Sequence, residues 1–169
     1  RIVGLFTATA YHRSTQTIPY IRHKVAQVRE AAGLDPASHS GKVFVNVLEG
    51  YPRDDLFQID AATLSNFARQ IAHLSERPRL RVLARADKFD RFVSVLCFIP
   101  RDHYDTRART RIGDYLARVY KGRVSAVYPH FPEGPLVRLH FIIGRDEGET
   151  PKVSQTDLER AVAEIVTTW

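Results

Sequence analysis

Apolar side chains recur at three- and four-residue spacing in several parts of the chain, which is the spacing of an amphipathic helix. Between residues 18 and 32 these side chains are Ile18, Ile21, Val25, Val28 and Ala32. Thr17 followed by Pro19 favours a helix with Pro19 at its first position, and Gly33 favours its end. The pattern therefore predicts a helix that begins at Pro19 and is stopped by Gly33.

A second helix is predicted over residues 61–75, where the same spacing is kept by Leu64, Phe67, Ile71 and Leu74. Asp60 is a good N-cap, and Arg77-Pro78 ends the pattern because proline excludes further helix. The segment 42–48 between these helices leaves two structures open. Its β-branched residues indicate a strand, whereas the glycines on either side also suit a short helix.

The chain begins with Arg1, and the strand-like residues 2–6 follow directly. We expect it to be a segment of a longer protein. Residues 1–78 then resemble the end of an upstream domain followed by a helical connector, with a boundary near Arg77-Pro78. No internal repeat interrupts this organisation.

From residue 79 the pattern changes to strands and helices in alternation. Residues 79–86 alternate apolar and polar, and residues 91–99 are apolar on both faces, which predicts a hairpin with one half-exposed and one more central strand. A helix is predicted over residues 105–121, ending at Lys121 and a C-cap Gly122. A second hairpin (124–128 and 136–143), an acidic loop (145–150) and a last helix carrying Leu158, Ala161, Val162, Ile165 and Trp169 follow.

This order of elements defines the fold class that we expect for residues 79–169. Two antiparallel hairpins, each followed by a helix on the same face, make a two-layer α+β sandwich. In kind it resembles the ACT-like and ferredoxin-like sandwiches, and the pattern leaves the strand order open.

Composition narrows the class of protein further. The chain has 169 residues, of which 44% are hydrophobic and 26% charged, enough for one ordinary core or two small ones. It holds no run of the roughly 18 apolar residues that cross a bilayer, so we expect a soluble, unexported protein without a membrane partner. The single cysteine, Cys97, lies in an apolar run and predicts burial. These features favour a cytoplasmic location.

The sequence contains none of the common motifs of a catalytic or metal-binding site. No G-x-G-x-x-G loop joins a predicted strand to a helix, so we predict no nicotinamide site in this chain. The seven histidines share no metal-ligand spacing, and one cysteine cannot complete the usual zinc patterns. Ser94, Asp102 and His103 lack a nucleophile elbow and are interpreted as core and loop residues.

The net charge of +6 permits an acidic partner. One candidate basic surface consists of Arg79, Arg81, Arg85, Arg107, Arg109, Arg111 and Arg118. Acidic residues are interspersed among them and no nucleic-acid motif accompanies them, so we favour a solvated or interdomain face over a nucleic-acid site. Phe89, Phe92 and Tyr104 lie at strand ends where a small-molecule pocket can open, although core packing is the simpler interpretation.

Several blocks of sequence then point to one family. They are residues 4–11 (GLFTATAY), 51–59 (YPRDDLFQI), 76–78 (ERP), 87–94 (DKFDRFVS) and 99–104 (IPRDHY). In this order they resemble the N-terminal half of the large bacterial NAD-specific glutamate dehydrogenases. The resemblance covers residues 1 to about 145.

The resemblance implies a parent enzyme that oxidises L-glutamate to 2-oxoglutarate and ammonia with NAD, as a cytoplasmic homo-oligomer with ACT-like modules before its catalytic domain. The glycine-rich cofactor loop and catalytic lysine of that family match no position here. We therefore expect a non-catalytic regulatory or oligomerisation segment, whose partners are the remainder of the chain and other subunits.

Two alternatives remain. ACT-like modules often bind amino acids, so an effector site is a hypothesis at Arg101, Asp102 and Tyr104, whose groups can match a zwitterion. The glycine-bearing ligand loop of amino-acid-binding ACT domains is not evident in this sequence. Nucleic-acid binding through the arginine surface is the weaker alternative.

Overall fold

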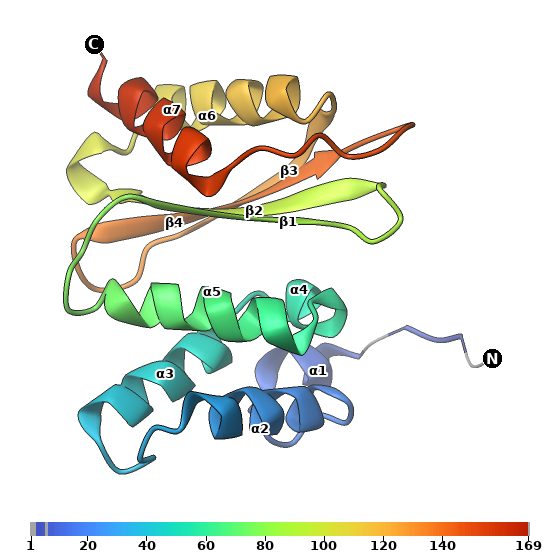
Figure 1. The fold of residues 1–169 in the computed structure, drawn as a ribbon, viewed down its shortest axis with the longest axis vertical. Helices are drawn as coiled ribbons and strands as arrows, with labels where there is room; N and C mark the ends of the chain where they lie inside the picture. The colour runs from blue at the N-terminus through green and yellow to red at the C-terminus, as the bar shows by residue number, and fades with distance from the viewer. Residues whose placement is uncertain (1–2, 6, 169) are drawn as a thin grey trace. The chain divides into compact units, whose positions relative to one another are not determined.

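The computed structural model describes residues 3–5 and 7–168. The chain divides into two compact units, Arg1–Arg77 and Pro78–Trp169. The first unit is helical, and the second combines a four-stranded sheet with helices (Figure 1). None of the helices formed by the described residues is long and apolar enough to span a membrane.

Five helices make up the first unit. They are α1 (Ala8–His12), α2 (Ile21–Ala32), α3 (His39–Gly50), α4 (Arg53–Gln58) and α5 (Ala61–His73). Helix α5 packs against both α2 and α3. Each of the three helices contributes fully buried side chains, such as Val25, Leu48 and Leu64, so their apolar stripes form the core of this unit.

Two of the helix predictions in this unit need correction. Helix α2 begins at Ile21 and not at Pro19, because Tyr20 has a φ of 73° and a ψ of −56°, a conformation that a continuous right-handed helix cannot contain. Gly33 does end it, in the left-handed conformation. The strand alternative for residues 42–48 is wrong: this segment lies in α3, which Ser38 caps by accepting a hydrogen bond from the Gly41 backbone N–H.

The helix predicted over residues 61–75 is confirmed, since α5 begins after Asp60, whose carboxylate accepts from the Thr63 N–H at 2.8 Å. The short helices α1 and α4 were not predicted. The strand-like segment 2–6 forms no strand at residues 3–5, and residues 2 and 6 lie outside the described part of the chain.

The second unit contains all four strands of the described chain. Its elements are β1 (Arg81–Ala86), β2 (Phe92–Pro100), the 3-10 helix η1 (Arg101–His103), α6 (Thr106–Val119), β3 (Arg123–His130), β4 (Leu136–Gly144) and α7 (Gln155–Thr167). The strand order is β1-β2-β4-β3, with every neighbouring pair antiparallel. Strands β2 and β3 are thus parallel to each other, and α6 connects them across β4 as a split β-α-β unit.

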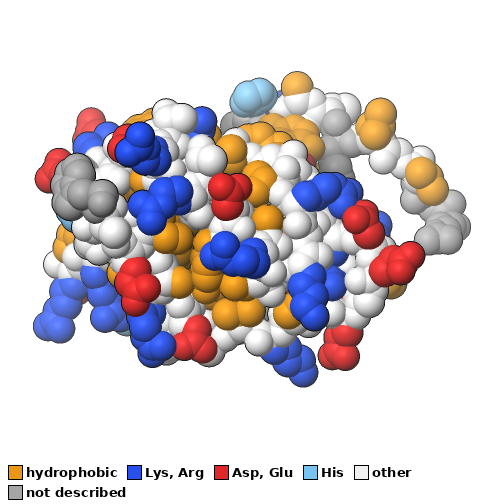
Figure 2. All heavy atoms as spheres, turned by 90° about the horizontal axis from the view of Figure 1, so that it is seen from above, with side chains coloured by type: hydrophobic (Ala, Val, Ile, Leu, Met, Phe, Trp, Pro, Cys, Tyr) orange, Lys and Arg blue, Asp and Glu red, His pale blue; other side chains and the backbone are white. Residues whose placement is uncertain are grey.

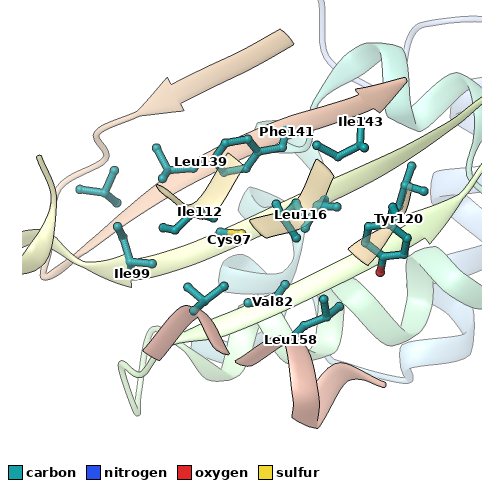
Figure 3. Close-up of a cluster of buried hydrophobic side chains, with 14 residues drawn as sticks. Val82, Cys97, Ile99, Ile112, Leu116, Tyr120, Leu139, Phe141, Ile143 and Leu158 are labelled. Atoms are coloured by element: carbon teal, nitrogen blue, oxygen red, sulfur yellow. The ribbon is translucent and has the colours of Figure 1, made fainter. Parts of the chain in front are cut away.

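Helices α6 and α7 cover one face of this sheet (Figure 1). Figure 3 shows the core between the layers, where side chains from the sheet such as Val82, Cys97 and Phe141 meet Leu116 and Leu158 from the helices. Cys97 is fully buried, as predicted. The two-layer α+β sandwich is therefore confirmed.

Strand β2 is also apolar on the face that α6 and α7 do not cover, because alternate residues of a strand point to opposite faces. Leu96 and Phe98 of β2 and Leu83 of β1 lie on this second face and are buried. The prediction that residues 91–99 are apolar on both faces is confirmed.

The C-terminal end of α6 differs from the predicted end. Lys121, and not Gly122, adopts the left-handed conformation after α6, with a φ of 52°. Gly122 instead allows close approach, since a Cβ atom there would lie 2.2 Å from the Gly144 carbonyl oxygen. Helix α7 starts at Gln155 after the N-cap Ser154, and Trp169 lies outside the described residues.

Candidate functional site

The predicted effector residues lie where β2 ends and α6 begins. Strand β2 runs into η1, and Asp105 then caps α6 by accepting from the Ala108 N–H at 2.6 Å. Proline at position 100 and the short 3-10 turn bring residues 101–104 to the end of the sheet beside the turn between β3 and β4. Arg101, Asp102 and Tyr104 are thus neighbours, but their side chains have different surroundings.

Arg101 is engaged by the turn between β3 and β4. Its Nε donates to the Gly134 carbonyl oxygen at 3.1 Å, and its Nη2 donates to that of Pro132. Its backbone N–H donates to the Pro135 carbonyl oxygen at 2.7 Å. Arg101 therefore holds the turn in place, and an effector carboxylate would have to use its remaining donors or displace these contacts.

Tyr104 packs edge-on against Phe131, with 5.1 Å between the ring centroids. Phe131 is 52% exposed, so the pair forms an aromatic patch at this end of the sheet. Asp102 is exposed and contacts no polar group within the described residues. His103 Nδ1 lies 3.1 Å from the Val166 carbonyl oxygen, where an imidazole N–H satisfies the C-terminal end of α7.

The opposite end of the sheet holds a cluster that the sequence did not reveal. Arg145 is buried, and backbone carbonyl oxygens surround its guanidinium group. They belong to Asp90, Tyr120, Glu147, Gly148 and Glu149, at distances between 2.8 and 3.3 Å, and the Thr150 hydroxyl accepts as well. One side chain thus ties together the β1–β2 turn, the end of α6 and the acidic loop.

The carboxylate of Asp90 completes this cluster by accepting hydrogen bonds from the Thr150 hydroxyl and backbone N–H. These bonds hold the pKa of Asp90 below its usual value. Burial raises the pKa of the nearby Tyr120 to about 12, so its phenol stays protonated. The arrangement is that of a structural clamp, since its groups are already satisfied by one another.

The predicted basic surface does not form as one block. Arg81 makes an ion pair with Glu159 of α7, with 3.3 Å between Nη1 and Oε1. Arg111 donates to the last carbonyl oxygens of α7. Figure 2 shows basic and acidic side chains interspersed over the layer that α6 and α7 form, with apolar side chains between them.

The three aromatic residues considered for a pocket are also dispersed. Phe89 is 65% exposed and lies beneath the cations of Lys88 and Arg91. Phe92 begins β2, whereas Tyr104 follows its end, so the length of the strand, roughly 27 Å, separates them. These residues do not line a common pocket.

Ser94, Asp102 and His103 are not brought together either. Ser94 lies in β2, and its hydroxyl is 2.8 Å from Nε2 of His140 on β4, on the buried second face of the sheet. Asp102 and His103 follow the far end of β2. The described residues contain no group of three His, Cys, Asp or Glu side chains able to hold a metal ion.

The fold and these contacts define a small α+β sandwich of the ACT-like kind, preceded by a helical unit. Comparison with known families agrees: residues 81–169 match the family described as "Glutamate dehydrogenase, ACT2 domain", and residues 18–77 match "Glutamate dehydrogenase, helical motif 1". The chain belongs to this glutamate dehydrogenase family.

Curated relatives carry the name NAD-specific glutamate dehydrogenase. The chain is 37% identical to that of Halomonas elongata over 170 residues, and 36% identical to that of Pseudomonas aeruginosa over 169 residues, in each case across 100% of its own length. It is 32% identical to that of Mycobacterium tuberculosis over 165 residues, 95% of its length. The chain spans 10% of the length of each of these relatives.

Proposed function

We propose that this chain is a non-catalytic regulatory or oligomerisation segment of an NAD-dependent glutamate dehydrogenase. The parent reaction would convert L-glutamate and NAD to 2-oxoglutarate and ammonia in the cytoplasm. The observation that carries the proposal is that two family matches, a helical motif and an ACT2 domain, lie in order along a chain that is a tenth of its relatives' length.

The sequence supports the non-catalytic part of this proposal. Its nine glycines include no G-x-G-x-x-G between a strand and a helix, so the chain lacks the loop that cradles a dinucleotide pyrophosphate. Ser94 and His140, whose side chains lie 2.8 Å apart, are both buried on the second face of the sheet. NAD would bind elsewhere in the parent enzyme, and residues 1–78 would join an upstream domain to the module of residues 79–169.

Exposed apolar side chains along the β3 edge support a role in association. Val124, Tyr128 and Phe131 are 40%, 60% and 52% exposed. At the other edge, by contrast, Glu159 of α7 accepts from the backbone N–H of Val82 in β1 at 3.1 Å. The β3 edge is therefore the side of the sheet best suited to contact another part of the dehydrogenase or another subunit.

Calorimetric titration of the 169-residue chain with NAD tests the non-catalytic role. We expect no binding heat and no NADH formation when L-glutamate is added, because the chain supplies no dinucleotide loop. The matched control is the complete enzyme under the same conditions. Saturable NAD binding by the chain alone would overturn this part of the proposal.

The second candidate function is amino-acid sensing at Arg101, Asp102 and Tyr104. In its favour, the three residues are adjacent and the Tyr104–Phe131 pair offers an aromatic wall. Arg101 is already engaged by two turn carbonyl oxygens. Titration with a panel of amino acids, compared between the wild-type chain and Asp102→Asn, tests it: an affinity that this change leaves unaltered would exclude the site.

Nucleic-acid binding through the arginines is the third candidate. The ion pair of Arg81 with Glu159 and the other acidic residues of α7, Asp157 and Glu164, argue against it. Association with duplex DNA at low salt is the decisive measurement, because electrostatic binding is strongest there.

A further inference from the structure

A cavity of 330 Å³ opens in the helical unit, between the C-terminal ends of α2 and α5 and the first half of α3. Its volume falls within the range of small-molecule sites, about 300 to 1,000 Å³. Helices from three separate segments of sequence form its walls, so the sequence alone did not indicate it. Its lining combines apolar side chains with polar and charged ones.

Apolar side chains from α3, α5 and the segment after α2 line part of the cavity, and they are called its floor below. Phe44 of α3 is only 2% exposed, and Val43 and Ala72 beside it are half-buried. Leu34, which follows α2, remains 40% exposed where it borders the cavity. A small apolar group placed here would cover Leu34 and remove apolar surface from water.

Two nitrogen-bearing side chains of α5 border the same cavity. Arg69 and His73 are one helical turn apart, so they lie on the same face of the helix. Arg69 Nη2 donates to the Ala31 carbonyl oxygen at 3.0 Å, which orients the guanidinium at the end of α2. Its other N–H groups contact no acceptor within the described residues, and a guanidinium binds carboxylates through such paired donors.

The rim of the cavity adds Glu76, an exposed carboxylate beyond the end of α5. Ser75 does not serve as a further donor to a ligand, since its hydroxyl donates to the Ala72 carbonyl oxygen at 2.8 Å. The cavity thus presents a cationic side, an apolar floor and one anionic group. These features match a small molecule with a carboxylate and a short apolar body.

We propose that this cavity binds a small carboxylate, with the carboxylate on Arg69 and His73 and the apolar body over Phe44 and Leu34. Amino acids and 2-oxo acids both have a carboxylate and an apolar body. Only amino acids have an ammonium group, which can reach Glu76. As an effector site, the cavity rests on the proposed regulatory function. It lies in the helical unit and is distinct from the Arg101 segment.

Heteronuclear NMR titration of the 169-residue chain tests the site with three probes of one chain length: pentanoate, L-norvaline and 2-oxopentanoate. We expect shift changes centred on Leu34, Phe44, Ala72 and His73. Tighter binding of L-norvaline than of 2-oxopentanoate would assign the site to amino acids, and the reverse order would assign it to 2-oxo acids. If the chemical shifts of these residues do not change at ligand concentrations up to about 10 mM, binding is too weak for an effector and the proposal is overturned.

Two variants and a control make the test specific. Arg69→Met should weaken binding about tenfold or more, because it removes a charge-assisted hydrogen bond. Ala72→Leu should occlude the floor while it leaves Arg69 in place. Arg22→Met, which removes an exposed charge of α2 outside the cavity, should bind as the wild type does. Equal affinities in all three variants would overturn the proposal.

These outcomes are independent of the association test described in the Discussion. If the chain binds none of the three carboxylates but still associates with the dehydrogenase, only the proposed effector site is ruled out. If the chain binds a carboxylate but associates neither with itself nor with the dehydrogenase, the proposed function is ruled out instead.

Discussion

Arg145 Nε donates to the carbonyl oxygen of Tyr120 at 2.8 Å, so a residue that follows β4 closes the end of α6. The remaining donors of the guanidinium reach carbonyl oxygens of the β1–β2 turn and the acidic loop. This buried cation has no carboxylate as its direct partner among the described residues, and its charge is solvated by peptide dipoles. The sandwich therefore depends on one arginine for the geometry of three connections.

Arg145→Lys should lower the free energy of unfolding by about 3 kcal/mol, since an ammonium group has three donors and leaves buried carbonyl oxygens without partners. Urea denaturation followed by circular dichroism measures the loss. The matched control is Arg123→Lys, whose ion pair with Asp146 is exposed and should contribute less than about 1 kcal/mol. Equal losses for the two variants would contradict the clamp.

Gly122→Ala should destabilise the sandwich by about 1 to 3 kcal/mol, because the added Cβ would meet the Gly144 carbonyl oxygen at 2.2 Å and force the backbone apart. Gly50→Ala is the control, since nothing lies within 4 Å of a Cβ at the end of α3. That change should be neutral or stabilising by up to about 1 kcal/mol. Thermal unfolding of both variants separates close approach from ordinary glycine flexibility.

Glu49 should make the helical unit sensitive to acid. Burial acts to raise the pKa of Glu49, but hydrogen bonds from Thr15 and Ser14 and the charge of Arg53 outweigh it and lower the pKa below 4.5. Because the folded pKa is depressed, this stabilisation is complete above pH 4.5 and is lost as the pH falls through the folded pKa.

The stability difference between the wild type and Glu49→Gln should accordingly shrink as the pH falls below 4.5. Denaturation curves across this interval provide the measurement. Glu30→Gln, at an exposed position of α2, is the control and should show no such change. If the difference in unfolding free energy between the wild type and Glu49→Gln stays constant with pH, the charge of Glu49 does not contribute to stability.

Cys97 should be inert in the native protein. Its thiol is fully buried in the core, and burial raises its pKa far above the usual value, so the reactive thiolate is suppressed. Reaction with a disulfide reagent should be slow in buffer and fast in denaturant. Rapid stoichiometric labelling without denaturant would contradict the packing of β2 against α6 and α7.

Local signals in the sequence predicted elements of both units. Asp60 marked the start of α5, and the alternation of residues 79–86 and 91–99 gave the first hairpin. The signals failed where distant residues decide the local structure. The local sequence predicts Gly122 as a helix cap. Its actual role is to allow close approach to the backbone of Gly144, 22 positions later. The β-branched segment 42–48 is helical because α3 buries one face against α5.

The candidate sites were harder to predict for the same reason. The sequence predicts Arg101 as an effector ligand, but its side chain donates to the carbonyl oxygens of residues 132 and 134. No pattern near position 101 indicates these contacts. Arg145 stood in an acidic loop and gave no sign of burial. The cavity beside Arg69 depends on the packing of three helices, which periodicity does not specify.

Sedimentation velocity of the 169-residue chain, alone and mixed with the remainder of the dehydrogenase, tests the proposed role in association most directly. We predict self-association or a complex, and we predict that Val124→Ser combined with Phe131→Ser weakens it. Phe89→Ser, in the β1–β2 turn and away from the β3 edge, should not weaken it. A chain that stays strictly monomeric and ignores the rest of the enzyme would contradict a regulatory or oligomerisation role.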